Sequence, residues 1–255
     1  MKKLMFVAAV AAGMVAFGDA IESQNIVGYN TTSHRQYYTL VVPEFDSVGT
    51  EGLNIQTITP DATTLASYGG GKVNIQTFTS GAAMSEKFYY FTAEEADDEE
   101  TAGWYSDGIG VTLASKTFAK GEGFMLYMPR EGGSLTISGE VSLDAKTVPF
   151  RQYYTLTGNF RPVPVNIQSL LVPSATILES YGAGKVNIQT FTSGAAMSEK
   201  FYYFTAEEAD DEETAGWYAD GIGVTLATKT FNPGEGFMIY MPAAGDVTFP
   251  AVSAE

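Results

Sequence analysis

The chain has 255 residues, of which 45% are hydrophobic, and it contains no cysteine. Its formal net charge of −16 disfavours nucleic acid and anionic lipid surfaces as partners, because phosphate binding requires clustered lysine and arginine. The apolar content is too high for a disordered chain, and the lack of cysteine excludes a disulfide-stabilised scaffold. The composition therefore predicts an acidic globular protein that is stabilised by its hydrophobic core.

The first twenty residues have the pattern of a bacterial-style export signal. Two lysines precede an apolar run that ends at Phe17, and small residues follow as far as Ala20. The run is shorter than the roughly 20 residues that span a bilayer, so we interpret residues 1–20 as a cleaved signal peptide. Cleavage after Ala20 removes two lysines and one aspartate, which changes the net charge from −16 to −17. We expect an exported protein at the cell surface, in the medium or in the periplasm, with no membrane insertion after signal removal.

A long passage occurs twice in the chain. Residues 72–118 return at 185–231 with only two differences, Ser106 against Ala219 and Ser115 against Thr228. Such near-identity indicates recent duplication and says little about individual residues. The surrounding sequence has diverged further, but it retains the hexapeptide RQYYTL, which begins at Arg35 and again at Arg151.

The duplication predicts two tandem modules. We place the first copy at residues 21–142 and the second copy at residues 143–255. The joint between them, GEVSLDAKTVPF, contains no long flexible linker, so we expect the copies to pack against each other. Two copies indicate a pseudo-symmetric pair rather than a solenoid.

Within a copy, apolar residues recur with the period of β-strands, and Gly, Pro, Asp or Ser bounds each run. The predicted strands of the first copy are 25–32, 36–42, 63–69, 72–79, 86–92, 110–118, 123–129 and 133–141. Residues 53–58 and 166–172 are interpreted as single helical turns, and residues 92–103 as a loop or helix. About seven or eight strands per copy predict an all-β protein of two small antiparallel sandwiches or barrels. Strand alternation predicts one inward and one outward ring in each pair, Tyr37–Tyr38 and Tyr153–Tyr154.

The order of these runs is NIVGY, YYTLVVP, an aromatic hairpin, KGEGFMLYMP and LTISGEV. It resembles a widespread module of bacterial secreted and surface proteins, with an aromatic-Thr-Leu strand, a Gly-x-Gly-aromatic strand and a Thr-x-Ser-Gly ending. The chain departs from that module at Tyr38 and Tyr154, where tryptophan is common, and at Lys120, where proline is common. The resemblance implies a non-catalytic surface or extracellular module, and it transfers no functional residue.

Each copy carries an acidic run after its strongly aromatic strand. Its carboxylates are candidate calcium ligands: Glu94, Glu95, Asp97, Asp98, Glu207, Glu208, Asp210 and Asp211. Calcium takes about six to eight oxygens from a loop that folds around the ion. These runs lack the alternating ligands and the mid-loop glycine of an EF-hand, so a solvated loop or helix end is the alternative interpretation. Calcium is the one cofactor for which the sequence gives any reason, and we predict none as a requirement.

Aromatic residues follow each acidic run and suggest a second kind of site. The candidate glycan-binding residues are Trp104, Tyr105, Asp107, Trp217, Tyr218 and Asp220. If the rings are exposed, they can stack on sugars while the carboxylates accept hydrogen bonds from hydroxyl groups. The alternative is that each tryptophan anchors the base of the loop in the core.

The sequence offers little for catalysis. His34 is the only histidine, so a histidine-based triad or a multi-histidine zinc site within one chain is excluded. The chain contains no G-x-S-x-G motif and no P-loop, and YGGGK at Tyr68 is interpreted as a hairpin turn. A secreted hydrolase is the weakest alternative, because a cluster of adjacent carboxylates does not hold two of them rigidly at a set distance.

A duplicated module suits bivalent attachment or assembly, since linking two weak sites multiplies avidity. We therefore predict a non-enzymatic structural or adhesive protein of the cell surface or extracellular matrix. Self-association is expected through an exposed strand edge such as residues 25–32, because unpaired edges template strand addition. The alternative is a carbohydrate-binding protein. The expected partners are further copies of the chain, other surface proteins or a polysaccharide.

Overall fold

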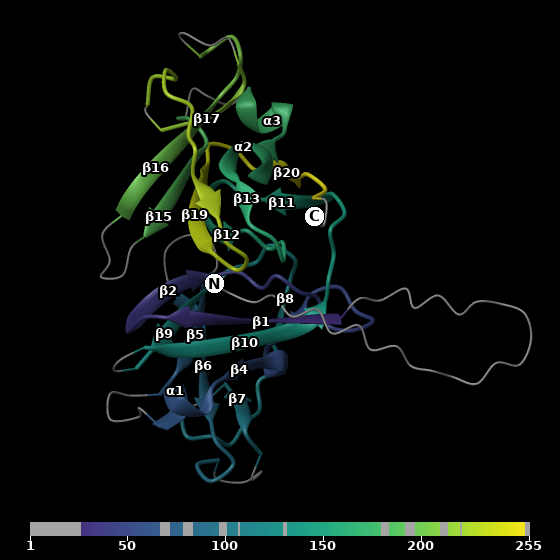
Figure 1. Ribbon diagram of the computed structural model, residues 1–255, viewed down its shortest axis with the longest axis vertical. Helices are drawn as coiled ribbons and strands as arrows, with labels where there is room; N and C mark the ends of the chain where they lie inside the picture. The colour runs from purple at the N-terminus through teal and green to yellow at the C-terminus, as the bar shows by residue number, and fades with distance from the viewer. Residues whose placement is uncertain are drawn as a thin grey trace, which may run out of the picture.

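The computed structural model describes residues 27–66, 72–78, 84–96, 101–106, 108–129, 132–179, 184–191, 197–209, 214–219 and 221–252. Over these residues the chain is all-β, as predicted, with antiparallel strands and a few short helical turns. The two halves lie one above the other along the long axis, and the chain passes between them from β10 to β11 (Figure 1). No helix in the described segments is long and apolar enough to cross a membrane.

The first half contains three antiparallel sheets. Its strands are β1 (Val27–His34), β2 (Tyr37–Val41), β3 (Leu53–Asn54), β4 (Ile58–Pro60), β5 (Asn74–Phe78), β6 (Met84–Phe91), β7 (Gly103–Tyr105), β8 (Thr117–Phe118), β9 (Phe124–Met128) and β10 (Gly133–Glu140). The strand orders are β2-β9-β5-β6-β7, β1-β10-β4 and β3-β8. Two short helices, η1 (Ile55–Thr57) and α1 (Ala62–Ala66), connect the sheets.

The second half repeats this topology. Its strands are β11 (Lys146–Phe150), β12 (Tyr153–Gly158), β13 (Val165–Asn166), β14 (Val172–Pro173), β15 (Asn187–Phe191), β16 (Met197–Phe204), β17 (Gly216–Tyr218), β18 (Thr230–Phe231), β19 (Gly236–Met241) and β20 (Gly245–Phe249). The orders β12-β19-β15-β16-β17, β11-β20-β14 and β13-β18 match those of the first half, and the helices are α2 (Ile167–Leu170) and α3 (Ala175–Leu178). Each half has ten strands within the described residues, more than the seven or eight expected.

The five-stranded and three-stranded sheets of each half enclose one hydrophobic core. In the first half, Ile75 and Leu126 of the larger sheet and Ile137 of the smaller sheet belong to the same buried cluster. The opposite side chains of the larger sheet face outward because successive residues of a strand alternate between the two faces. Each half is therefore a small sandwich.

Local capping explains where the structure departs from the predicted elements. Residues 63–69 were expected to form a strand, but α1 begins there because the Asp61 carboxylate accepts a hydrogen bond from the Thr64 amide at 2.6 Å, which is an N-cap interaction. The helical turns predicted at 53–58 and 166–172 are confirmed as η1 and α2. The predicted strand at 110–118 is reduced to β8 at its end.

The halves contact each other through equivalent positions. The Gly123 amide of the first half donates a hydrogen bond to the Leu156 carbonyl of the second half at 3.0 Å. The positions equivalent to these, Gly236 and Leu40, also meet, because a Cβ on Gly236 would lie 2.6 Å from the Leu40 carbonyl carbon. Val42 of the first half is buried in the hydrophobic cluster of the second half. The copies therefore pack directly on each other with approximate two-fold correspondence.

Candidate functional site

The four aromatic residues of the predicted glycan site lie inside the protein. The exposed fractions of Trp104, Tyr105, Trp217 and Tyr218 are all 0%. The indole nitrogen of Trp104 donates to the Ile58 carbonyl at 2.7 Å, and that of Trp217 donates to the Leu171 carbonyl at 3.2 Å. These rings anchor the cores, so the hypothesis that they stack on sugars is wrong. Asp107 and Asp220 lie outside the described residues.

The described part of each acidic run has a structural task. Glu95 forms an ion pair with Lys72 at 3.0 Å and accepts a hydrogen bond from the Thr92 amide at 3.2 Å, which closes a turn rather than starting a helix. Partial burial raises the pKa of Glu95, but the contacts with Lys72 and Thr92 outweigh it and lower the pKa. Glu208 pairs with Lys185 in the same way.

Calcium binding stays a prediction. Glu94 and Glu207 are exposed, and no group of three metal-ligating side chains occurs among the residues that the structure describes. The remaining candidate ligands, Asp97, Asp98, Asp210 and Asp211, lie outside the described residues.

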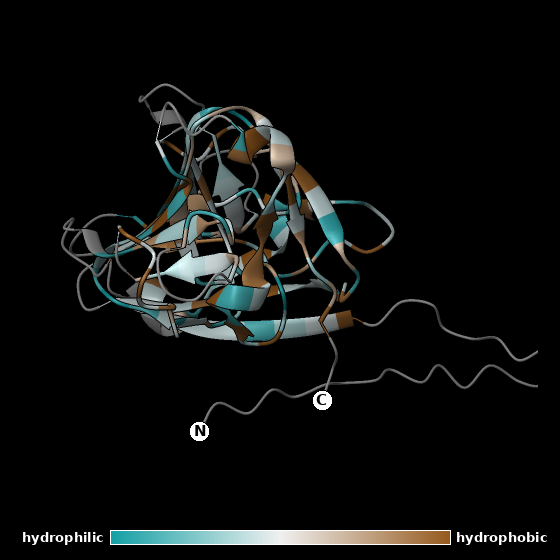
Figure 2. Ribbon diagram, turned by 90° about the horizontal axis from the view of Figure 1, so that it is seen from above, coloured by the Kyte–Doolittle hydropathy of each residue, from teal (hydrophilic) through white to brown (hydrophobic). Residues whose placement is uncertain are grey.

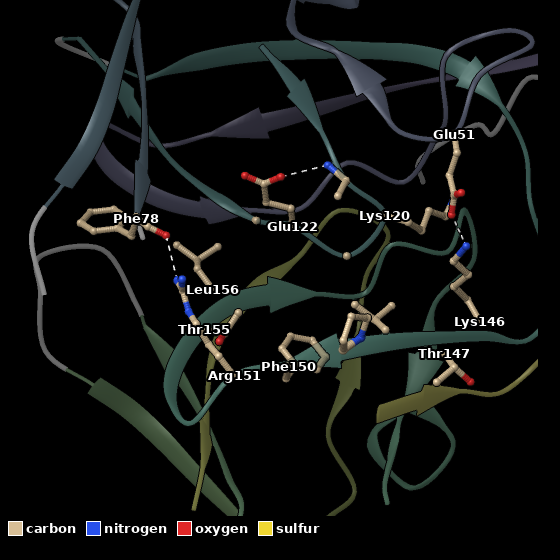
Figure 3. Close-up of a pocket in the computed structure, with 15 residues that line it drawn as sticks. Glu51, Phe78, Lys120, Glu122, Lys146, Thr147, Phe150, Arg151, Thr155 and Leu156 are labelled. Carbon is tan, nitrogen blue, oxygen red and sulfur yellow. Dashed lines mark hydrogen bonds and ion pairs between the residues drawn. The ribbon is translucent and has the colours of Figure 1, made fainter. Parts of the chain in front are cut away.

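A cleft of about 510 Å³ lies between the halves (Figure 3). Phe78, Glu122 and Gly123 of the first half face Arg151 and Leu156 of the second half across it. A guanidinium nitrogen of Arg151 donates to the Phe78 carbonyl at 3.3 Å, so the arginine bridges the two halves. Glu122 is held by the Ala119 amide at 2.9 Å. Lys146 forms an ion pair with Glu51 at the other end of the cleft, as Figure 3 shows.

A second cleft, of about 360 Å³, is formed by the equivalent positions. Here Arg35 and Leu40 of the first half lie against Phe191, Glu235 and Gly236 of the second half. Each retained RQYYTL hexapeptide thus contributes its arginine, threonine and leucine to one of the two clefts. The single histidine of the sequence also lines this second cleft, and its Nε2 atom is hydrogen-bonded to the Thr32 hydroxyl at 2.8 Å.

The two tyrosines of each hexapeptide are exposed beside these clefts. Tyr37 and Tyr153 are 53% and 58% exposed, and Tyr38 and Tyr154 are also exposed. The expectation of one inward and one outward ring is therefore wrong. The reason is the backbone, because Tyr37 and Tyr153 adopt φ angles of 72° and 75°, which interrupt the alternation of the strand. This left-handed conformation costs a residue with a Cβ about 1–2 kcal/mol.

Tyr38 and Tyr154 begin a row of side chains across the outer face of each large sheet. In the first half the paired positions are Tyr38, Tyr127, Asn74 and Tyr89, and in the second half they are Tyr154, Tyr240, Asn187 and Tyr202. The pairing continues to the buried Tyr105 and Tyr218, and Asn74 and Asn187 are also buried, so each row is exposed mainly at its Tyr38 or Tyr154 end. We call these the tyrosine rows. Sequence reasoning missed them because the row appears only when the strand register is known.

A buried carboxylate lies near the contact between the halves. Glu44 is 1% exposed, and burial raises its pKa to about 7. Its Oε1 atom accepts a hydrogen bond from the side-chain amide nitrogen of Asn30 at 2.6 Å. Its Oε2 atom has no hydrogen-bond partner in the described part of the chain. That Oε2 atom lies 3.1 Å from the point that a Cβ on Gly234 of the second half would occupy. The protonation of Glu44 is therefore linked to folding near the junction.

Strand β1 is the longest strand at a sheet edge in the first half. It pairs with β10 over all eight residues, and in the strand order of its sheet it has no second neighbour. Along it, exposed and half-buried residues alternate, with Tyr29, Thr31 and Ser33 on the exposed face. The Thr31 hydroxyl lies 2.8 Å from the Thr136 hydroxyl across the pair. Figure 2 shows β1 along the lower edge of the molecule, largely in light and teal colours.

No family model, curated protein or solved structure matches the chain. The resemblance to the bacterial surface module is therefore tested by none of these comparisons.

Proposed function

We propose that the chain is an exported, non-enzymatic structural or adhesive protein that self-associates through β1. The observation that carries this proposal is the position of β1, an eight-residue strand at the edge of the β1-β10-β4 sheet. An edge strand presents backbone N–H and C=O groups to which another strand can add. The exposed face of β1 is uncharged, since its side chains are those of Val27, Tyr29, Thr31 and Ser33.

The equivalent edge of the second half is better protected. Strand β11 has only five residues, and it contains Lys146 and Pro149. Lysine and proline both discourage strand addition, the first by its charge and the second because it has no N–H to donate. This contrast favours β1 as the edge that pairs. Two β1 strands from two copies form an isologous contact, which closes as a dimer rather than growing into a filament.

The test is the solution mass of the chain without residues 1–20, measured by light scattering over a concentration series. We expect the mass to rise from that of one chain to that of two chains and then to remain constant. The double variant Tyr29→Lys/Thr31→Lys should stay monomeric, because it places like charges on both edges while leaving the inward face of β1 unchanged. The matched control is Thr147→Lys on the exposed face of β11, which should dimerise as the wild type does.

Two results would overturn the proposal. One is a wild-type mass that stays at one chain throughout the series. The other is a Tyr29→Lys/Thr31→Lys variant that still dimerises with wild-type affinity. Circular dichroism of each variant must show the wild-type spectrum, so that loss of pairing is separated from loss of fold.

A further inference from the structure

We propose that two pairs of exposed tyrosines bind an uncharged polysaccharide by stacking on its sugar rings. The pairs are Tyr37–Tyr38 and Tyr153–Tyr154, each at the exposed end of one tyrosine row. This inference names a ligand for the adhesive role proposed above, and it rests on that role. It does not depend on pairing through β1. Three observations on the same residues carry it.

The first observation is that RQYYTL is identical in the two halves although its neighbours are not. TTSH precedes it in the first half and TVPF in the second, and VVPEF and TGNFR follow it. Core packing explains the retention of the leucine, which lies at the contact between the halves. It does not explain two exposed tyrosines, because exposed positions tolerate substitution. The packing of the halves therefore gives no reason for the two exposed tyrosines, and their exposure in both halves supports a binding role.

The second observation is the backbone of Tyr37 and Tyr153. Both residues have a positive φ angle, a conformation that glycine adopts without steric penalty and that a bulky residue disfavours. The tyrosine is therefore present twice at a cost to folding. Its effect is to turn two consecutive rings outward, as no regular strand does. Retained backbone strain of this kind is concentrated at functional sites.

The third observation is that the face beside these rings is held by side-chain hydrogen bonds. Gln76 donates from its amide nitrogen to the Tyr38 hydroxyl at 3.1 Å and to the Asn74 side-chain oxygen at 2.9 Å. The rings of Tyr38 and Tyr127 lie 5.3 Å apart at an angle of 58°.

The second half reproduces this arrangement. Gln189 donates to the Tyr154 hydroxyl at 3.1 Å and to Asn187 at 2.9 Å, and the rings of Tyr154 and Tyr240 are 5.2 Å apart. Rings that are fixed before binding lose little conformational freedom when a ligand stacks on them.

The chemistry of the face selects an uncharged carbohydrate. Tyrosine combines a flat apolar ring with a hydroxyl that donates and accepts hydrogen bonds, so the exposed rings match the apolar planes and hydroxyl groups of sugars. Asn74 and Gln76 are buried, at 5% and 7% exposure, and serve to hold the rings in place. The four positions of the row carry no formal charge, and the net charge of −16 repels polyanions. Lys87 and Lys200 lie over the Tyr89 and Tyr202 rings, at 4.9 Å and 4.8 Å, at the end of each row away from Tyr38 and Tyr154. Two equivalent faces in one chain suit a ligand with repeating units, on which two weak sites reinforce each other.

The experiment compares the wild type with Tyr37→Gly/Tyr153→Gly. Glycine removes the ring but suits the positive φ angle, so the variant should fold as stably as the wild type or more stably. The probes are insoluble glucan, mannan and chitin in a co-sedimentation assay. We expect the wild type to sediment with at least one of them and the double variant to lose at least tenfold in affinity. Each single glycine variant should keep one face and lose only the gain from bivalency.

The Tyr29→Lys/Thr31→Lys variant separates the two proposals. It should bind the polysaccharide even where it no longer dimerises, because the exposed tyrosines of both halves are unchanged in it. A wild type that sediments with none of the three polysaccharides would overturn this inference, as would a double glycine variant with wild-type affinity. If the double glycine variant loses dimerisation while sedimentation is unchanged, the tyrosines bind protein and the inference is again overturned.

Discussion

Replacement of Trp104 by alanine should lower the free energy of unfolding by about 3–5 kcal/mol, the range found when a fully buried large aromatic side chain is removed. The indole ring has 0% exposure and packs edge-on against Tyr90, with the ring centroids 5.4 Å apart. The change also leaves the Ile58 carbonyl without its 2.7 Å hydrogen bond inside the core. Both effects act in the same direction, so the loss should be among the largest of any single substitution in this half.

The measurement is urea denaturation followed by far-UV circular dichroism, which reports both halves, and by tryptophan fluorescence. The chain has two tryptophans, one in each half, so Trp104→Ala leaves Trp217 as the reporter of the second half. Because Val42 of the first half is buried in the core of the second, we expect the Trp217 transition to move to lower urea as well. A transition of Trp217 at its wild-type midpoint would show that the halves unfold independently.

The matched control is Trp217→Ala, with Trp104 as the reporter. Trp217 has the same 0% exposure, and its ring lies 5.3 Å from that of Tyr203, so a loss of similar size is expected. If either substitution cost less than about 1 kcal/mol, the assignment of these rings as core anchors would be contradicted.

The fold class could be predicted from the sequence because it depends on local patterns. Alternation of apolar residues identified β2, β5, β6, β9 and β10 to within two residues at each end. The failures are local as well. At α1, the carboxylate of Asp61 caps a helix in a stretch that is rich in threonine, and that hydrogen bond outweighs the preference of threonine for strands.

The candidate site was harder to predict because it depends on contacts between distant residues. Trp104 follows an acidic loop, which is as consistent with an exposed ring as with a buried one. The Gln56 side chain decides the matter, since it accepts from the Trp104 amide at 2.9 Å and donates to the Trp104 carbonyl at 2.9 Å, which fixes the start of β7 against the core. Gln56 and Trp104 are 48 residues apart in the sequence, and that spacing does not predict the contact.

The tyrosines show the opposite error. Strand periodicity predicted one inward ring in each pair, because periodicity assumes a regular backbone. The φ angle of 72° at Tyr37 breaks that regularity, and it cannot be predicted from the sequence. The repeated hexapeptide was the available signal. The hexapeptide is identical in the two halves although its neighbours differ. This identity does not indicate whether the residues are retained for core packing, for lining the clefts or for exposing the rings.

Glu44→Gln should make the protein more stable at pH 8 by roughly 3 kcal/mol and have little effect near pH 4. Burial raises the pKa of Glu44 from 4.5 to about 7, whereas the unfolded chain titrates near its ordinary value. Between these two values the folded state holds a proton that the unfolded state has released. The contribution of Glu44 to stability is therefore fully present below about pH 4.5, is lost as the pH rises to about 7, and is constant above it. A difference of one pKa unit corresponds to about 1.4 kcal/mol, which gives the expected size.

Glutamine removes the titration but keeps the contact, because its side-chain oxygen can accept the hydrogen bond that Asn30 now donates to Glu44 at 2.6 Å. Free energies of unfolding of the wild type and of Glu44→Gln at several values between pH 4 and pH 8 check this. Equal pH dependence in the wild type and in Glu44→Gln would contradict the raised pKa.

The apolar residue at the equivalent position of the second half, Phe160, is fully buried and cannot titrate, so the effect should arise from the first half alone.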